Sequence, residues 1–301
     1  MSGTKKIIEC VPNFSEGRDL KKIEKIVEPF RAKEGVKLLD YQKDEDHNRA
    51  VVTVVGEPGP LQTAVVESMG IAVDVVDMRK HKGQHPRMGA IDVVPFIPVK
   101  NISMEETVDY SKAVAEEVAA KYALPIFLYE RSASHPQRQN LANIRKGQFE
   151  GMAEKIKDPQ WAPDFGPQEI HPTAGVTAMG ARMALVAFNV NLDSTDIETA
   201  DQIAKKVRHI SGGLRYCKGI GIELKDRGIV QVSMNMTDYT KTALYRVFEL
   251  IKIEARRYGI NVIGSEIIGL VPMEALINTA EYYLGIEKFS MQQVLEARIY
   301  E

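Results

Sequence analysis

The stretch MRKHKGQHPRMGAIDVVPFIP, residues 78–98, joins a basic loop to a strand and organises the first half of the chain. Two of the six histidines, His81 and His85, lie in the loop among lysines and arginines, where glycines and a proline break any regular element. Residues 91–98 are rich in Val, Ile and Phe, which predicts a strand closed by prolines. A positively charged loop held by a strand can bind an anion and present an imidazole that titrates near neutrality.

The hydrophobic pattern before and after this stretch predicts the order β-α-β-β-α-β for the first part of the chain. The elements before the loop are a strand at 6–12, a helix at 20–31, strands at 36–41 and 49–55, and a helix at 61–76. Together with the strand after the loop, they have the order of the split βαβ, or ferredoxin-like, unit. A helix at 104–122 follows, with Ser103 and Glu106 spaced as a capping box.

A long segment without periodicity separates the two halves. A strand at 124–129 and weak helical periodicity at 137–156 precede it, and residues 157–175 are rich in Pro and Gly. Irregular segments of this length inside a compact protein are usually functional or linkers.

The second half repeats the element order of the first. The expected elements are a strand at 183–192, a helix at 196–210, a hairpin of strands at 217–224 and 229–236, a helix at 242–258, a strand at 261–268, and helices from Pro272 and Ser290. The fold class is therefore α+β, with two ferredoxin-like subdomains covering residues 1–180 and 181–301.

Polar residues alternate along two strands of the second half. Asn189 and Asn191 share one face of their strand, and Gln231, Ser233 and Asn235 share one face of theirs. Helices cover only one face of a split βαβ sheet, so these polar faces are expected on the uncovered side. Two such sheets can face each other across a groove with the helices outside; alternatively, each polar face meets bulk solvent.

Composition limits the classes of function. A length of 301 residues suits one large or two medium domains, and a net charge of −2 disfavours a general nucleic-acid or anionic-membrane binder. The N-terminus has no apolar signal region, and no apolar stretch is long enough to span a membrane. With only two cysteines, a disulfide framework is not expected, which favours a reducing, cytoplasmic location.

Several motifs carry a family resemblance that spans nearly the whole chain. They are, in chain order, CVPNFSEG at 10–17, HKGQHPRMGAIDV at 81–93, WAPDFGP at 161–167, GAR at 180–182, AFNVNL at 187–192 and GSEIIGLVP at 264–272. This set resembles the glutamate formiminotransferases, folate-dependent transferases of histidine degradation and one-carbon metabolism. The resemblance implies transfer of a formimino group between 5-formiminotetrahydrofolate and glutamate, with tetrahydrofolate as co-substrate, folate lying between the two sheets, and a homodimer. Since the chain stops at Glu301, a stand-alone form without a cyclodeaminase domain is expected.

The resemblance also suggests site residues. The histidine before Pro-Arg-Met-Gly matches the family's catalytic position, so His85 is the expected general acid–base, and His81 is expected only to position the loop. The family's folate-binding segment corresponds to Gly166, Pro167, Gln168, Glu169, Ile170, His171, Pro172, Thr173, Ala174 and Gly175. Because the substrates carry carboxylates, cationic partners are needed, and the candidates are Arg49, Lys82 and Arg87. No metal is expected.

Other readings remain open. The donor can be formimino or formyl, the acceptor glutamate or glycine, and the carboxylate partner of His85 is not identified. A histidine metallohydrolase would use His81 and His85 at i, i+4, but Pro86 disfavours a helix there and the E-x-x-H core is absent. An RNA-binding module lacks the aromatic pair it needs on the central strands. A regulator that binds a small anion is a further possibility.

Overall fold

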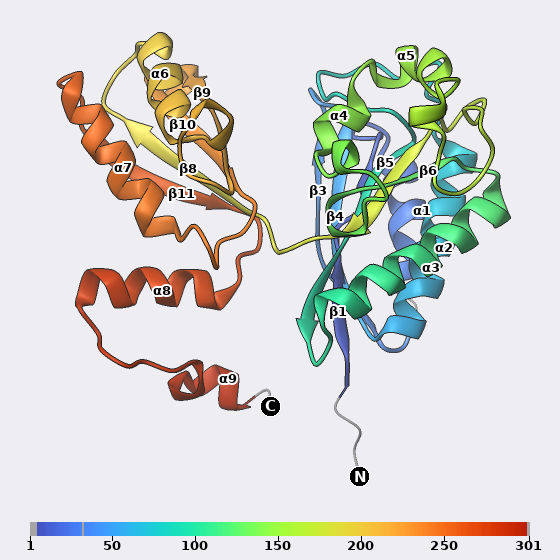
Figure 1. Ribbon diagram of the computed structural model, residues 1–301, viewed down its shortest axis with the longest axis horizontal. Helices are drawn as coiled ribbons and strands as arrows, with labels where there is room; N and C mark the ends of the chain where they lie inside the picture. Colours follow the sequence, from blue (N-terminus) through green and yellow to red (C-terminus); the bar gives the residue numbers. More distant parts are fainter. Residues whose placement is uncertain (1–4, 32, 300–301) are drawn as a thin grey trace. The chain divides into compact units, whose positions relative to one another are not determined.

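The chain folds into two compact α/β units, one ending at Arg182 and the other beginning at Met183 (Figure 1). The structure, a computed structural model, describes residues 5–31 and 33–299. Residues 1–4, the start of the N-terminal stretch considered above, lie outside the described residues. Each unit pairs a sheet with helices, so the predicted α+β class with two α/β subdomains is confirmed.

The N-terminal unit is built on a mixed sheet. Its strands are β1 (Ile7–Cys10), β2 (Asn13–Phe14), β3 (Val36–Asp44), β4 (Arg49–Gly56), β5 (Ile91–Lys100), β6 (Ile126–Leu128) and β7 (Thr177–Ala181). β3 pairs with β4, β4 with β1 and β2, and these with β5, all antiparallel. The first predicted strand is in fact two short ones, because Pro12 between them has no N–H to donate to a ladder.

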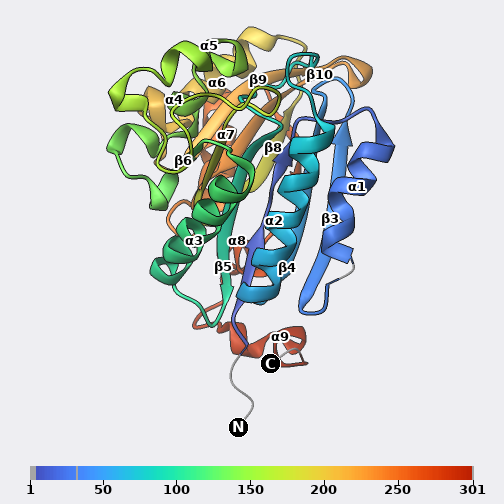
Figure 2. The same ribbon diagram turned by 90° about the vertical axis from the view of Figure 1, so that its right-hand side faces the viewer.

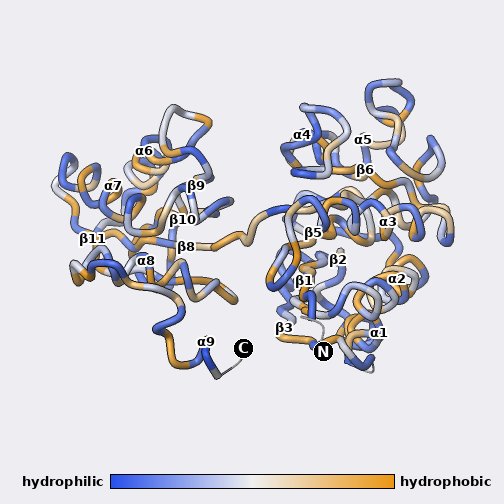
Figure 3. Tube along the Cα trace, turned by 60° about the horizontal axis from the view of Figure 1, so that its bottom comes forward, coloured by the Kyte–Doolittle hydropathy of each residue, from blue (hydrophilic) through white to orange (hydrophobic). Residues whose placement is uncertain are grey.

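Three helices cover one face of this sheet, namely α1 (Leu20–Arg31), α2 (Pro58–Val75) and α3 (Met104–Tyr122) (Figure 2). Hydrophobic and hydrophilic residues alternate along α1 (Figure 3), and its residues Ile23, Ile26, Val27 and Phe30 are buried. The capping box of α3 is confirmed: Ser103 Oγ accepts from the Glu106 N–H, and the Glu106 carboxylate accepts from the Ser103 N–H. Amphipathic spacing and capping thus place these helices as predicted.

An extension follows α3, in which the strand predicted at 124–129 is confirmed as β6 and a further strand, β7, was not predicted. β6 and β7 add parallel strands beside β5, and between them lie α4 (Leu141–Arg145), α5 (Gln148–Lys155) and the 3₁₀ turns η1 (Glu130–Ser132), η2 (Pro136–Arg138) and η3 (Pro159–Trp161). The weak periodicity at 137–156 corresponds to two short helices, because Gly147 takes a φ of 96° between them.

The prediction that prolines close β5 is wrong. Pro95 and Pro98 lie inside the strand, which continues to Lys100. A proline loses its donor but keeps its carbonyl, and Pro95 O accepts from Val11 N at 3.2 Å. The strand can therefore run past both residues.

The C-terminal unit is a four-stranded antiparallel sheet with helices on one face (Figure 1). Its elements are β8 (Val186–Leu192), α6 (Ile197–Val207), η4 (His209–Ser211), β9 (Cys217–Leu224), η5 (Lys225–Arg227), β10 (Ile229–Met236), α7 (Leu244–Arg257), β11 (Val262–Ile268), α8 (Met273–Leu284), η6 (Met291–Gln293) and α9 (Leu295–Ile299). The strand order is β11-β8-β10-β9. The element order β-α-β-β-α-β is confirmed in this unit, and the ferredoxin-like assignment stays a prediction.

A ladder of polar side chains runs across the β8–β11 sheet. The strand register pairs Gln231 with Asn191 and Ser233 with Asn189, so the predicted sharing of one face is confirmed. Gln231 Nε2 donates to Asn191 Oδ1 at 2.8 Å and to Glu266 Oε1 at 2.6 Å. These bonds satisfy the amides of Asn191 and Gln231, which explains how both remain buried. A groove between the two sheets stays a prediction.

Within residues 5–31 and 33–299, no helix combines the length and apolar character needed to cross a membrane.

Candidate active site

Two of the segments singled out in the sequence lie side by side in the N-terminal unit. The histidine loop, residues 78–90, is hydrogen-bonded at both ends to the end of the 166–175 segment. Met78 N donates to Thr173 O at 2.8 Å, and Ala90 N donates to Ala174 O at 2.8 Å. The tertiary fold therefore joins the predicted catalytic loop to the predicted folate segment.

This contact requires glycine on both sides. A Cβ at Gly89 would lie 2.2 Å from Val176 O, and a Cβ at Gly175 would lie 2.3 Å from Met88 O. Gly175 also has a φ of +71°, a conformation that other residues rarely adopt. The two glycines allow the two backbones to approach closely.

His85 lies at the centre of the candidate site. Its residue surface is 9% exposed, and no hydrogen bond joins its ring to another of the described residues. Burial, and after it the positive charges of Arg49 and Arg145, lower the pKa of His85 to about 3. In the free protein the imidazole is therefore neutral at pH 7 and able to accept a proton.

His81 is held by its neighbours in one tautomer. Arg87 Nε donates to His81 Nδ1 at 3.2 Å, so the other ring nitrogen carries the proton and donates to Asn48 O at 2.9 Å. Both ring nitrogens are engaged in holding the loop. This geometry leaves His81 no free lone pair for a metal ion.

Arg87 is buried and already paired. Its two terminal nitrogens bind the Glu150 carboxylate of α5 at 2.7 and 3.0 Å, and Gln148 Oε1 accepts at 3.0 Å. Phe149 N donates to Arg87 O at 2.9 Å, so α5 holds both the side chain and the backbone of this residue. A substrate carboxylate at Arg87 would have to displace Glu150.

Arg49 and Lys82 have different surroundings. Arg49, the first residue of β4, has a buried Nε that lacks a hydrogen-bond partner, and burial lowers the pKa of its guanidinium. Lys82 is exposed, and its backbone carbonyl accepts from Asn48 Nδ2 at 3.0 Å. Of the three predicted cations, Arg49 is the one with a buried nitrogen that lacks a hydrogen-bond partner.

The sequence reading missed Arg145, which reaches the site from α4. Its Nε donates to Asp92 Oδ2 at 2.9 Å, and its Nη2 donates to the same oxygen. Asp92 is 1% exposed and also accepts from Met88 N at 3.0 Å. A carboxylate inside an apolar strand demands a buried cationic partner, so Asp92 within IDVVPF was a signal for such a residue without indicating which one.

Hydrogen bonds fix the 166–175 segment at both of its ends. Before it, the buried Arg138 donates to Asp164 Oδ2 at 2.7 Å and to the carbonyls of Gln160 and Ala162. At its end, His171 and Gly175 exchange two backbone hydrogen bonds of 3.0 Å, and the His171 ring accepts from Ala174 N. Between these anchors, Gly166, Gln168, Glu169 and Pro172 are exposed. The segment is therefore an exposed loop that hydrogen bonds hold at both ends.

No group of three or more His, Cys, Asp or Glu side chains in the described part of the chain is arranged to hold a metal ion.

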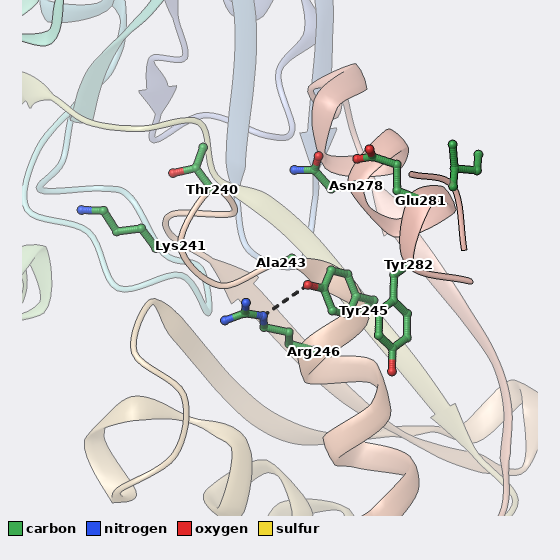
Figure 4. A pocket seen from close by; sticks show the side chains of 9 residues that line it. Thr240, Lys241, Ala243, Tyr245, Arg246, Asn278, Glu281 and Tyr282 are labelled. Carbon is green, nitrogen blue, oxygen red and sulfur yellow. Dashed lines mark hydrogen bonds between the residues drawn. The ribbon is translucent and has the colours of Figure 1, made fainter. Parts of the chain in front are cut away.

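A hollow of about 390 Å³ lies in the C-terminal unit, lined by residues of α7 and α8 (Figure 4). There Tyr245 and Tyr282 stack with ring centroids 4.2 Å apart, and Arg246 Nε donates to the Tyr245 hydroxyl. None of the site residues predicted from the sequence lines this hollow.

Comparison with known proteins gives matches over nearly all of the chain. The model of the formiminotransferase domain, N-terminal subdomain, matches residues 7–182, and that of the formiminotransferase domain matches residues 187–299. The glutamate formimidoyltransferase of Streptococcus pyogenes serotype M1 is 56% identical over 97% of this chain and 98% of its own length. That of Thermoplasma acidophilum is 41% identical over 97% of both chains. The formimidoyltransferase-cyclodeaminase of Rattus norvegicus is 42% identical over 94% of this chain and 53% of its own length.

Proposed function

The chain belongs to the formiminotransferase family, and on that premise we propose that it transfers a formimino group between 5-formiminotetrahydrofolate and glutamate. In the direction written, the products are tetrahydrofolate and N-formiminoglutamate; the reaction is reversible and belongs to the degradation of histidine. The observation that carries the proposal is the position of His85, a buried imidazole in a loop bonded to the 166–175 segment. We propose the two units as the two subdomains of the family.

In this mechanism His85 moves one proton. The neutral imidazole takes a proton from the ammonium group of glutamate, and the resulting amine attacks the formimino carbon. A new C–N bond forms, giving a tetrahedral intermediate. The imidazolium then donates its proton to N5 of the folate as the C–N5 bond breaks, which regenerates neutral His85. Acid–base catalysis of this kind contributes about 10²–10⁴-fold.

The 166–175 segment is proposed to bind folate. Its exposed residues offer backbone groups between two fixed ends, and the Arg138–Asp164 pair holds the chain just before it. Because the 166–175 segment is hydrogen-bonded to the histidine loop, a folate bound to this segment would bring its N5 toward His85. Arg49, Lys82 and Arg87 are the proposed carboxylate partners, and Arg49 is favoured because Glu150 already occupies Arg87.

A direct assay tests the reaction. The donors 5-formimino- and 5-formyltetrahydrofolate are each paired with glutamate and with glycine, and product formation is followed. We expect turnover with the formimino donor and glutamate. Preference for the formyl donor would favour a related formyltransferase, and preference for glycine a different acceptor. A rate that chelators abolish would support the hydrolase alternative.

We also propose a cytoplasmic homodimer. The family resemblance supports the dimer, and the two cysteines, Cys10 and Cys217, are buried and unpaired, as suits a reducing compartment. Sedimentation equilibrium at micromolar concentration tests the dimer, and a monomer across that range would contradict it.

A further inference from the structure

Two arginines from distant parts of the sequence converge near His85. Arg49 stands at the start of β4, two residues before Val51, and Val51 pairs with Asn13, which pairs in turn with Val93 of β5. Arg49 therefore lies near the beginning of β5, where Asp92 is buried. Arg145 reaches Asp92 from α4 through two of its nitrogens. The charges of both arginines act on His85.

Positive charge acts on His85, since Arg49 and Arg145 both lower its pKa. Asp92, a buried carboxylate at the start of β5, is shared by Arg145 and the Met88 N–H. Arg49 keeps a buried Nε without a hydrogen bond. Burial and the charge of Arg145 lower the pKa of its guanidinium, against the opposite effect of the Asp44 and Asp92 carboxylates. A buried donor without a partner destabilises a fold. Such a residue is suited to an anion that arrives with the substrate.

Both substrates of the proposed reaction carry carboxylates, and position distinguishes them. The α-carboxylate of glutamate is attached to the same carbon as the attacking nitrogen. The glutamyl tail of folate is separated from N5 by the aminobenzoyl ring. A general base must lie within about 3 Å of the proton it takes. A carboxylate bound beside His85 therefore belongs to the amino acid.

Resting on the proposed function, we propose that Arg49 and Arg145 form a binding pair for the α-carboxylate of the amino-acid substrate. Arg49 supplies its unpaired Nε, and Arg145 contributes charge and its Nη1 while holding Asp92. The bound carboxylate offsets the positive charge that acts on His85, which raises the pKa of His85 and makes it a better base when the substrate is present. The pair thus couples substrate binding to activation of the base.

The test uses Arg49→Gln in the full-length protein, with Arg79→Gln as a control that removes an exposed arginine of the histidine loop. Two competitive inhibitors separate the carboxylates: 2-aminobutyrate keeps only the α-carboxylate of glutamate, and 4-aminobutyrate keeps only the other. Arg49→Gln should weaken glutamate and 2-aminobutyrate about tenfold or more. It should leave 4-aminobutyrate and the folate donor unchanged. The melting temperature should stay constant or rise, since the variant removes a buried Nε that has no hydrogen-bond partner.

Other results overturn the proposal. If Arg49→Gln raises KM for the folate donor only when the donor carries its glutamyl tail, the pair binds that tail. If it lowers the melting temperature and weakens all ligands equally, Arg49 is structural. Arg145→Lys, which keeps a cation opposite Asp92, should show the same ligand order with a smaller effect. A parent protein that transfers no formimino group would refute the proposed function, whereas inhibitor binding by calorimetry still tests the pair.

Discussion

The two histidines of the loop differ in what surrounds their rings. His85 has no hydrogen-bond partner among the described residues, while both nitrogens of His81 are engaged by Arg87 and Asn48. We expect His85→Ala to lower kcat by about 10²–10⁴ while folate binding is largely kept. His81→Ala should keep substantial activity and lose stability by about 1–3 kcal/mol, because it removes two hydrogen bonds. Steady-state kinetics and folate titration check this, and a near-normal kcat in His85→Ala contradicts the assignment.

The low pKa of His85 has a consequence for stability. Its folded-state pKa of about 3 lies below the unfolded value of 6.5, so the unfolded chain binds more protons between these values. The contribution of neutral, buried His85 to the free energy of unfolding is complete above pH 6.5. This contribution is lost as the pH falls toward 3. At ~1.4 kcal/mol per unit of pKa, the loss from this group is about 2 kcal/mol at pH 5.

The measurement compares urea unfolding of the parent and of His85→Asn at pH 7.5 and pH 5. His81 and His171 also have lowered pKa values and act in the same direction, but they remain in both proteins. The parent should therefore lose more stability than His85→Asn on acidification. An equal loss in the two proteins would mean that His85 titrates normally in the folded state.

Arg87 can act through its protein partner or through a substrate, and Glu150 separates the two roles. Lysine at position 87 would keep the charge and lose the two-pronged contact with Glu150. If Arg87 holds the loop, Arg87→Lys and Glu150→Gln should change KM for glutamate and folate to a similar, modest degree. We expect this result from the geometry. If Arg87→Lys changes KM much more than Glu150→Gln does, Arg87 binds a substrate carboxylate.

At the scale of elements, α4 and α5 hold the histidine loop in place. Arg145 of α4 binds Asp92, Glu150 of α5 binds Arg87, and Lys155 donates to carbonyls at the end of α4. Trp161 follows directly, with Lys155 Nζ 3.9 Å from its ring centroid. Burial lowers the pKa of Lys155 to about 8. Residues 141–161 thus link the histidine loop to the entrance of the 166–175 segment.

Trp161 provides a probe of that segment, since it is the single tryptophan in the chain. If residues 166–175 bind folate, saturating folate should slow amide exchange between Trp161 and Gly175 and change the Trp161 fluorescence. Gly175→Ala should weaken the response, because its Cβ meets Met88 O and its φ is positive. Gly212→Ala is the control, a positive-φ glycine of the C-terminal unit with open space around it. Unchanged exchange across 161–175 would exclude the segment from folate binding.

The sequence predicted elements with strong periodicity and clear ends. α1 and α3 have the predicted bounds, because Ile23, Ile26 and Phe30 repeat at helical spacing and Ser103 caps α3. β7 was missed, since TAMGA is short, contains no aromatic residue and has Thr177 as its single β-branched residue. Its strand state depends on pairing with β5 and β6, which single-sequence patterns do not carry.

The site could be predicted only where residues are close in sequence. The loop with His81 and His85 was recognisable as one stretch, but its partners come from 44–49, 145–150 and 171–176. The pairing of Arg145 with Asp92 spans 53 residues, and nothing in the local pattern around Arg145 indicates its buried contact. Charged residues were judged by type alone, so Arg49, Lys82 and Arg87 appeared equivalent. Their burial and partners now distinguish them.

At the scale of the whole molecule, each unit has its own hydrophobic core. The buried clusters of the N-terminal unit draw on residues up to Met179, and the core of the C-terminal unit draws on residues from Val186 onward. A domain with its own core can unfold on its own. We therefore expect equilibrium unfolding of the ligand-free protein in more than one step.

Trp161 belongs to the N-terminal unit, so its fluorescence reports on that unit, whereas far-UV circular dichroism reports on both. In a urea titration the two signals should not coincide. Val232→Ala, which truncates a fully buried residue of β10, should shift the dichroism transition and leave the fluorescence midpoint unchanged. Val54→Ala, an equally buried residue of β4, should shift the fluorescence midpoint. If Val232→Ala moves both signals together, the units unfold as one and their cores are thermodynamically coupled.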